Sequence, residues 1–98
     1  MKNKASEKIA GGKLVRVEVE FSDKIDFIQI TGDFFMHPET SIEDIEDILL
    51  DTSITASENE IKEKIDVILT EDNVTLYGVT SADIARVTRA ALSGGSKL

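Results

Sequence analysis

Hydrophobic and polar residues alternate most regularly over residues 13–21. Val15, Val17 and Val19 occupy every second position, and charged residues stand between them. A period of two is typical of a strand with one buried face and one face in water. A second β-rich run, residues 25–30, follows a short polar break. The two runs together predict an antiparallel hairpin.

An acidic amphipathic helix is predicted next. Apolar residues recur at helical spacing between residues 42 and 49, and acidic residues fill the other side. Two starting points are open, since Pro38 is a favourable first-turn residue and Thr40 with Glu43 forms a capping-box pattern. Either start places acidic side chains near the positive end of the helix dipole.

Two further helices and a short extended segment follow. A capping-box pattern at Ser57 precedes an apolar stripe at helical spacing, which predicts the second helix. Residues 74–79 predict a short third strand, which we expect to pair at one edge of the hairpin. Thr80 or Ser81 then caps the third helix, which is expected to stop near Gly94.

These elements predict a small single domain of the α+β class with the order ββααβα. A lone hairpin is unstable in water, so the three helices must cover its apolar face. Residues 1–12 are polar and rich in lysine up to Gly11 and Gly12, and we expect them to form a flexible N-terminal arm. The domain then spans residues 13–93, and residues 94–98 form a C-terminal tail.

Composition excludes several classes of protein. The chain has 98 residues, no cysteine, one histidine and a formal net charge of -8. A disulfide scaffold, thiolate catalysis and cysteine-based metal sites are therefore excluded. The negative charge argues against binding to nucleic acid or to an anionic membrane. Because no apolar run has the length of a signal peptide or a membrane span, we expect a cytoplasmic globular domain.

The negative charge is concentrated in the middle of the chain. Residues 39–72 hold twelve acidic and two basic side chains, whereas residues 1–38 hold six of each. Such a segment forms either a solvated acidic face or a surface complementary to a basic partner, because charge asymmetry steers association more than it determines the fold.

Gly11, Gly12 and Lys13 stand directly before the first predicted strand. Backbone N–H groups at glycines beside a lysine can bind a phosphate, but a Walker loop requires a longer frame that continues into a helix. Here a strand follows instead. We therefore expect no autonomous nucleotide site, and we interpret the glycines as residues that let the chain enter the sheet without a steric clash.

Gly32 and Asp33 open the most unusual segment, with the sequence GDFFMHP. The adjacent rings of Phe34 and Phe35 cannot both face one core from an extended segment. Two interpretations are open. Either both rings pack on different elements around a turn, or one ring belongs with Met36 to a docking surface.

No self-contained active site is visible in the sequence. Asp33, His37 and Glu39 could be written as a metal-binding pattern, but the pattern is loose and arises easily by chance in an acidic chain. His37 has no cysteine and no serine in a nucleophile-elbow context as a partner. We therefore predict neither a catalytic residue nor a metal site in this chain.

Three phrases in this order resemble the C-terminal accessory domain of lipoate-protein ligases. They are GGKLVRVEV at residues 11–19, GDFF at residues 32–35 and YGVTSADI at residues 77–84. The resemblance covers residues 11–92. In bacterial enzymes this domain usually follows a large catalytic domain, whereas some archaea encode it as a separate subunit. A chain that begins at Met1 and carries no catalytic domain resembles the separate form.

The resemblance implies a function for a complex rather than for this chain alone. The family activates lipoate with ATP to lipoyl-AMP and transfers the lipoyl group to a lysine of a lipoyl domain. The catalytic lysine and the sites for ATP, lipoate and Mg belong to the catalytic subunit. This chain is therefore expected to bind no cofactor and to form a heterodimer with that subunit. The alternative is a stand-alone adaptor domain that binds an unrelated protein.

The glycine-lysine and GDFF motifs are expected to form one contact surface, because the start of one hairpin strand lies beside the end of the other. Lys13 is expected to contact an anionic group of the partner or its nucleotide, and one of Phe34 and Phe35 to be an apolar anchor. The acidic surface around Glu43 and Asp47 is the alternative. The candidate residues for the partner interface are Gly11, Gly12, Lys13, Gly32, Asp33, Phe34, Phe35 and His37.

Overall fold

The computed structural model describes residues 1–9 and 11–93. The elements in chain order are β1 (Lys2–Ile9), β2 (Lys13–Phe21), β3 (Ile25–Gly32), β4 (Phe35–His37), α1 (Ser41–Leu49), α2 (Glu58–Glu71), β5 (Thr75–Tyr77) and α3 (Ser81–Leu92). The α+β class is confirmed, and β2, β3, α1, α2, β5 and α3 follow the predicted order ββααβα. Strands β1 and β4 are additional. Within the described ranges, no helix is long and apolar enough to cross a membrane.

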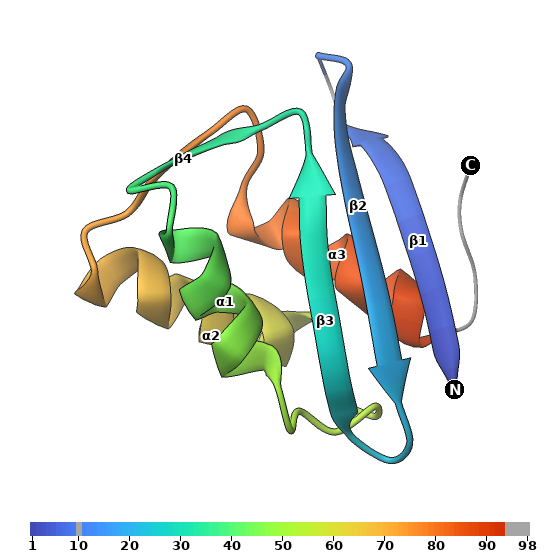
Figure 1. The fold of residues 1–98 in the computed structure, drawn as a ribbon. Coiled ribbons are helices and arrows are strands. Elements are labelled where there is room, and N and C mark those ends of the chain that lie inside the picture. Colours follow the sequence, from blue (N-terminus) through green and yellow to red (C-terminus); the bar gives the residue numbers. More distant parts are fainter. Residues whose placement is uncertain (10, 94–98) are drawn as a thin grey trace.

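The molecule has a sheet layer and a helix layer (Figure 1). Strands β1, β2 and β3 form an antiparallel sheet in that order, and β4 pairs separately with β5. Helix α3 lies against one face of the sheet at β1 and β2, α1 lies beside β3, and α2 packs against both α1 and α3. The helices therefore cover one face of the three-stranded sheet and leave the other face open.

The buried face of β2 supplies the centre of the core, as its alternation predicts. Val15, Val17 and Val19 are at most 1% exposed. Across the ladder, Val17 lies opposite Ile30 and Val19 opposite Ile28, which are also buried. Fully burying a side chain of this size contributes about 1.5 to 3 kcal/mol, so these few positions hold a large share of the domain's stability.

The prediction of a flexible arm over residues 1–12 is wrong, because Lys2–Ile9 form β1 and pair with β2 along its length. Ala5 is 1% exposed, and the Asn3 side chain donates a hydrogen bond to the Ala91 carbonyl of α3 at 2.9 Å. The strand was missed because two of its inward positions, Asn3 and Glu7, carry polar side chains, which bind α3. The predicted C-terminal tail and the helix stop near Gly94 lie outside the described residues.

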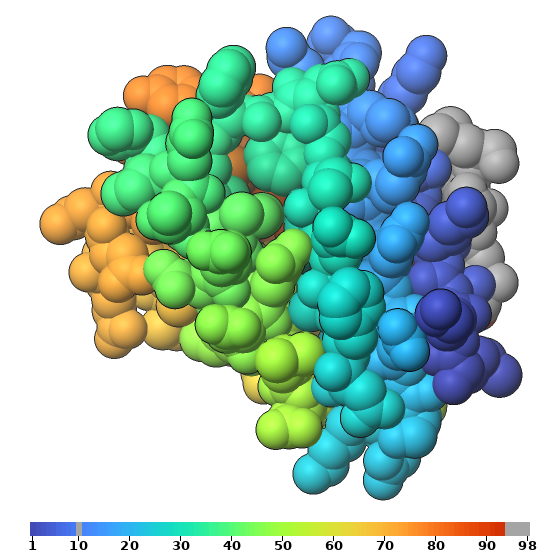
Figure 2. Space-filling view, in the orientation of Figure 1, coloured from blue at the N-terminus to red at the C-terminus, as the bar shows by residue number. Residues whose placement is uncertain are grey.

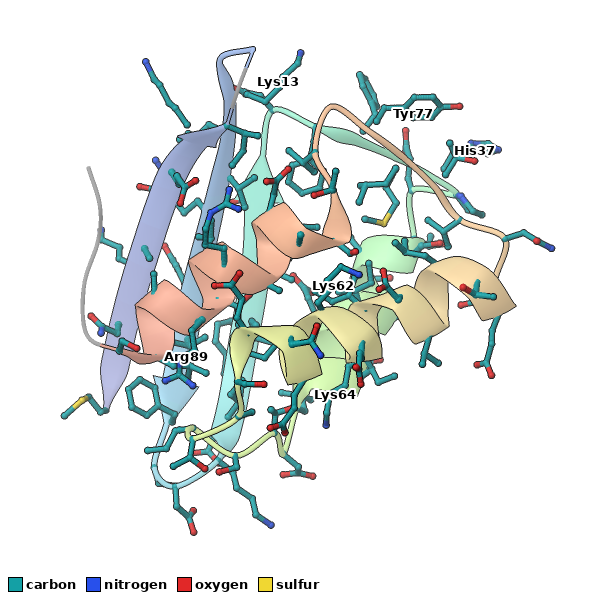
Figure 3. The ribbon with its side chains drawn as sticks, turned by 180° about the vertical axis from the view of Figure 1, so that it is seen from behind. Lys13, His37, Lys62, Lys64, Tyr77 and Arg89 are labelled. Atoms are coloured by element: carbon teal, nitrogen blue, oxygen red, sulfur yellow. The ribbon has the colours of Figure 1, made fainter. Side chains whose placement is uncertain are left out.

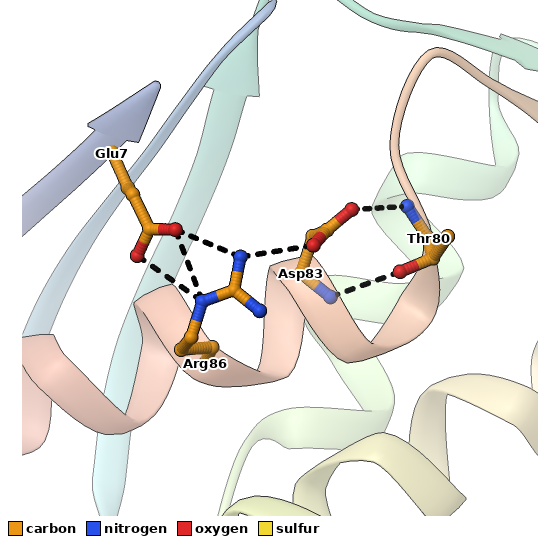
Figure 4. Close-up of polar contacts among 4 residues, drawn as sticks. All are labelled: Glu7, Thr80, Asp83 and Arg86. Atoms are coloured by element: carbon orange, nitrogen blue, oxygen red, sulfur yellow. Dashed lines mark hydrogen bonds and ion pairs between the residues drawn. The ribbon is translucent and has the colours of Figure 1, made fainter. Parts of the chain in front are cut away.

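An ion-pair network ties β1 to the start of α3 (Figure 4). Arg86 donates hydrogen bonds to both carboxylate oxygens of Glu7, at 2.8 to 3.2 Å, and to Asp83 at 2.9 Å. Asp83 also forms a capping box with Thr80, as the prediction of a cap at this position requires. Partial burial raises the pKa of Asp83, but the hydrogen bonds from Thr80 and Arg86 outweigh it and lower that pKa overall.

The three helix starts differ in how they are capped. The predicted box before α2 is present, with the Ser57 hydroxyl accepting from the Glu60 N–H at 3.1 Å. Thr40 precedes α1, but its backbone is already helical and its side chain makes no capping hydrogen bond within the described chain. The capping box between Thr40 and Glu43 is therefore not formed, although acidic residues do occupy the first turn of α1.

The third predicted strand, β5, pairs with β4 instead of with an edge of the hairpin. One hairpin edge is occupied by β1. At the other edge, the Glu46 carboxylate of α1 accepts a hydrogen bond from the Ile30 N–H at 2.7 Å. β4 and β5 form a second small ribbon at one end of the molecule.

Candidate functional site

The predicted motifs meet at the end of the molecule where the β4–β5 ribbon lies. We call the surface formed there by Lys13, Phe35, His37, Tyr77 and Gly78 the rim patch. Lys13 begins β2, Phe35 and His37 belong to β4, and Tyr77 ends β5. Figure 3 shows Lys13, His37 and Tyr77 projecting at this same end. The rim patch thus combines segments that are more than sixty residues apart in the chain.

Gly32 and Asp33 position the rim patch from the end of β3. The Asp33 N–H donates to the Leu14 carbonyl at 2.9 Å and extends the β2–β3 ladder by one residue. A Cβ atom at Gly32 would lie 2.1 Å from that carbonyl oxygen, which is far inside van der Waals contact. Only glycine therefore fits, and its role is to let the backbone leave the sheet toward β4.

The two adjacent phenylalanines have different environments. Phe34 is half-buried and packs against the core, whereas Phe35 is 70% exposed. In β4 the side chains alternate, so that Met36 points inward and Phe35 and His37 point outward. The apolar anchor predicted for one of the two phenylalanines can therefore only be Phe35.

Tyr77 and Gly78 are the residues of the rim patch that the sequence reasoning missed. Tyr77 contributes its aromatic ring. It lies directly opposite Phe35 in the β4–β5 ladder and is 57% exposed. Directly opposed aromatic residues are cross-strand neighbours, so the two rings form one surface. Phe35, His37 and Tyr77, together with Met36 and Glu39, line a shallow hollow. The signal available in the sequence was the alternation of Thr75, Leu76 and Tyr77, which places Tyr77 on the face opposite the apolar Leu76.

The side chain of Lys13, at the start of β2, lies against Gly78, which directly follows β5. A Cβ atom at Gly78 would lie 3.5 to 3.7 Å from three carbons of the Lys13 side chain, so the aliphatic part of this lysine packs over Gly78. Lys13 is exposed and, among the described residues, lies in no ion pair. Gly11 and Gly12, in contrast, form an exposed turn in which, among the described residues beyond their chain neighbours, no atom lies within 4 Å of a Cβ built at either position. The interpretation that these glycines avoid a steric clash is therefore wrong, and a positive φ at both positions favours glycine instead.

The rim patch offers apolar contact and one cation but no catalytic constellation. His37 and Glu39 line the hollow, whereas Asp33 does not, so the loose metal pattern is not brought together there. In the part of the chain that the structure describes, no three His, Asp or Glu side chains are placed to hold a metal. The exposed rings of Phe35 and Tyr77 beside the exposed Lys13 are suited to contact with a partner surface.

Burial raises the pKa of Glu46, while the Ile30 N–H lowers it and the nearby Glu43 and Asp47 raise it further. This carboxylate sits on α1 at the edge of β3, where its hydrogen bond covers the backbone of the sheet. It does not line the hollow of the rim patch. Its perturbed pKa therefore reflects the packing of α1 on the sheet.

No model of a known protein family and no curated protein sequence matches the chain. A solved structure does match, with 32% sequence identity, a TM-score of 0.73, and coverage of 91% of this chain and 96% of the other. That structure comes from an archaeal lipoylation system, described as a bi-partite lipoate protein ligase and its E2 lipoyl domain from Thermoplasma acidophilum. Because the similarity extends over nearly the whole of both chains, this chain belongs to the family of lipoate-protein ligase accessory domains.

Proposed function

We propose that this chain is the noncatalytic accessory subunit of a heterodimeric lipoate-protein ligase. Together with the catalytic subunit it is required for ATP-dependent activation of lipoate to lipoyl-AMP, and so for lipoylation of lipoyl-domain lysines. The observation that carries the proposal is the 32% identity to a protein of a bi-partite ligase system over 91% of this chain. In this proposal ATP, lipoate and Mg bind to the catalytic subunit.

A physical role for such a subunit follows from the chemistry of an acyl-adenylate. The mixed anhydride hydrolyses unless water is excluded from it, and a domain that closes over the active site can exclude water and then withdraw. The rim patch supplies the apolar surface that such a role needs, because the rings of Phe35 and Tyr77 are exposed side by side.

We assign the rim patch to the interface with the catalytic subunit. Aromatic residues are enriched among the residues that contribute most to binding, which fits Phe35 and Tyr77. Lys13, beside them, is placed to contact an anionic group of the partner or its nucleotide. A separate subunit lacks the effective concentration that a tether supplies, so the interface must be substantial. We expect a buried area of about 1,200 to 2,000 Å² and a Kd of about 1 µM or tighter.

The test is a comparison of pyrophosphate release by this chain, by the catalytic subunit and by their mixture, each supplied with lipoate, ATP and Mg. This chain alone should release no pyrophosphate, and the mixture should release it much faster than the catalytic subunit alone. Pyrophosphate release by this chain alone would contradict the proposal. Titration calorimetry that finds only millimolar affinity between the two proteins would count against the heterodimer.

The second candidate function is a protein-binding adaptor without a role in lipoylation. An exposed aromatic surface without catalytic groups would serve that function equally well. An adjacent gene for a catalytic ligase domain that lacks its own accessory domain would favour the ligase subunit. Failure of this chain to co-purify with such a catalytic domain would favour the adaptor.

A further inference from the structure

The outer edge of β3, which faces away from β2, is covered along part of its length. Near the start of β3, the Ile25 N–H donates to the Thr52 carbonyl and the Asp51 N–H donates to the Ile25 carbonyl, both at 2.9 Å. Further along, the Glu46 carboxylate accepts from the Ile30 N–H. Strand edges are usually protected in this way, because their free N–H and C=O groups can pair with another chain. The last residues of β3 have no such cover within the described chain.

Two backbone groups at the end of β3 point away from the sheet. The Asp33 N–H donates to the Leu14 carbonyl, which makes these residues a hydrogen-bonded pair of the β2–β3 ladder. Such pairs alternate in an antiparallel ladder, so Thr31 also turns its N–H and C=O toward β2. In a planar trans peptide the C=O and the N–H point to opposite sides, so the Ile30 C=O and the Gly32 N–H point outward. Among the described residues, neither group has a hydrogen-bond partner.

Ile30 and Gly32 line an apolar hollow, which we call the edge hollow. It lies between the end of β3, β4 and the first turn of α1, and its lining includes Met36 and Ile42. Of the described residues that line it, Glu39 alone is charged. Figure 2 shows the surface on which β3, in cyan, borders the green segment of β4 and α1. The edge hollow therefore combines apolar contact with free backbone hydrogen-bonding groups.

An extended polypeptide fits this combination, because strand addition uses the free backbone groups of a sheet edge. In a parallel strand, one residue opposite Thr31 donates to the Ile30 C=O and accepts from the Gly32 N–H. Both free groups are then satisfied without displacing Glu46. In an antiparallel strand, the residue opposite Ile30 would compete with Glu46 for the Ile30 N–H. The edge therefore favours a parallel strand.

The side chains of such a strand would meet the edge hollow at alternate positions. The residue opposite Thr31 shares the exposed face of the sheet with it. The residues before and after it turn their side chains to the other face, where Phe34, Met36 and Ile42 lie. Glu39 disfavours an acidic side chain at this position. The matching segment is therefore extended and places an apolar side chain in the hollow.

We propose that the edge hollow binds an extended segment of the catalytic subunit, which adds to β3 as a parallel strand and places an apolar side chain beside Ile42. This inference rests on the proposed function, since its occupant is the partner assigned there. The edge hollow is continuous with the rim patch, because Phe35, Met36 and Glu39 line both the edge hollow and the hollow of the rim patch. One partner surface can therefore cover both.

The direct test is amide hydrogen exchange of this chain, measured by NMR, alone and in complex with the catalytic ligase subunit encoded by the same genome. The Gly32 N–H should exchange fast in the free chain and at least about tenfold more slowly in the complex, because it gains a hydrogen bond. The carbonyl carbon resonance of Ile30 should shift downfield for the same reason. The control is the N–H of Asn59 in the exposed first turn of α2, which should exchange equally fast in both states.

A pair of matched substitutions tests the apolar contact. Ile42 and Ile48 are both half-buried residues of α1 that pack against the core, but of the two only Ile42 lines the edge hollow. Ile42→Gln should weaken binding to the catalytic subunit about tenfold and Ile48→Gln less than about twofold, as titration calorimetry would measure. Both variants should lower the Tm by a similar amount, so a folding defect alone would not explain the difference.

The outcomes separate this inference from the proposed function. If the mixture activates lipoate but the Gly32 N–H still exchanges fast, or if Ile48→Gln weakens binding as much as Ile42→Gln, the inference is wrong and the accessory role stands. Slow exchange of the Gly32 N–H that depends on the concentration of this chain alone would identify a second copy as the occupant and would also overturn the inference. If calorimetry detects no complex and pyrophosphate release does not depend on this chain, the proposed function fails, and the inference fails with it.

Discussion

The β1–α3 seam and the rim patch arrange charged and apolar side chains in opposite ways. In the seam, which consists of Glu7, Asp83 and Arg86, each charge meets an opposite charge at 2.8 to 2.9 Å. In the rim patch, Lys13 lies in no ion pair among the described residues, and the rings of Phe35 and Tyr77 are mostly exposed. The seam satisfies its groups within the chain, whereas the rim patch leaves them available.

The energies involved show why this difference matters. An ion pair that is partly exposed contributes about 1 kcal/mol or less, since solvent screens it. Burying one aromatic side chain removes about 150 to 250 Å² of surface from water, at about 25 cal/mol per Å² of apolar area. The rim patch therefore has more free energy to gain from a partner than the seam gives to the fold. This contrast is testable by substitution in both regions.

The largest expected effect lies at Gly32, where the sheet gives way to the rim patch. Gly32→Ala should destabilise the protein by roughly 3 kcal/mol, because the new Cβ would overlap the Leu14 carbonyl oxygen. Thermal unfolding should show a fall in Tm of about 15 °C. Gly78→Ala is the control, since it also has a positive φ but only ordinary contacts, and it should cost about 1 kcal/mol. Equal effects at both positions would contradict the close-approach argument.

The next effect concerns the apolar part of the rim patch. Phe35→Ala/Tyr77→Ala should weaken binding to the catalytic subunit about 100-fold, because two central aromatic contacts are lost. The Tm should stay nearly constant, since both rings are exposed in the free chain. Calorimetric titration provides the affinity. Phe27→Ala, an exposed ring on the open sheet face, is the control and should change the affinity less than about twofold.

The seam should respond in the opposite way. Arg86→Ala should lower the free energy of unfolding by about 1 to 1.5 kcal/mol, because it leaves the partly buried carboxylate of Glu7 without its partner and removes one of the hydrogen bonds that Asp83 accepts. Hydrogen exchange should become faster in β1, and the affinity for the catalytic subunit should be unchanged. A variant that loses affinity as much as stability would show that the seam and the rim patch are not independent.

Lys13→Ala should have a smaller effect, confined to the reaction. We expect pyrophosphate release by the complex to slow about fivefold, with a nearly constant Tm, because an exposed lysine contributes little to folding. Lys24→Ala at the other end of the hairpin is the control. If Lys13→Ala and the variants of both phenylalanines assemble and react normally, the rim patch is structural. The acidic surface around Glu43 would then be the better candidate.

The smallest expected effect is a pH dependence of the free energy of unfolding. It arises at Glu46, outside the seam and the rim patch. Burial raises the pKa of Glu46 above its ordinary value of 4.5, so in that range the folded state binds more protons than the unfolded state. Stability should therefore fall as pH rises from about 4.5 through the folded pKa of Glu46. Glu46→Gln should abolish this fall, which urea unfolding at a series of pH values would measure.

Asp83 should contribute a pH dependence of stability with the opposite sign, which the same series of unfolding measurements would detect. Its lowered pKa stabilises the fold above the ordinary aspartate value of 3.8, and this contribution is lost as pH falls through the folded pKa. Glu46→Gln should not change the loss of stability that Asp83 causes at acid pH. If Glu46→Gln changed the loss of stability at acid pH and not the fall above pH 4.5, our assignment of these two effects to Asp83 and Glu46 would be wrong.

Sequence reasoning succeeded wherever the physical cause was local. The alternation around Val17 identified the central strand, because burial on one face requires a period of two. The pattern of Ser57 and Glu60 identified the start of α2, because a capping box joins residues only three apart. The motif phrases led to the family for the same reason, since each is a short contiguous segment.

Long-range contacts decided the rest. β1 has no apolar alternation, and one of its inward side chains, Glu7, finds its partner at Arg86, 79 residues away. The identity of the exposed ring depended on β4, whose direction follows from the approach of Gly32 to Leu14 and from pairing with β5.

The sequence by itself therefore determined the α+β class, the helices of the core and the family of this chain. Only the tertiary structure decided that its first residues form a strand, that Phe35 rather than Phe34 is exposed, and that Tyr77 lies beside it. The reason is physical: capping and amphipathic periodicity act over a few residues, whereas strand pairing and the exposure of a side chain depend on segments that meet only after folding.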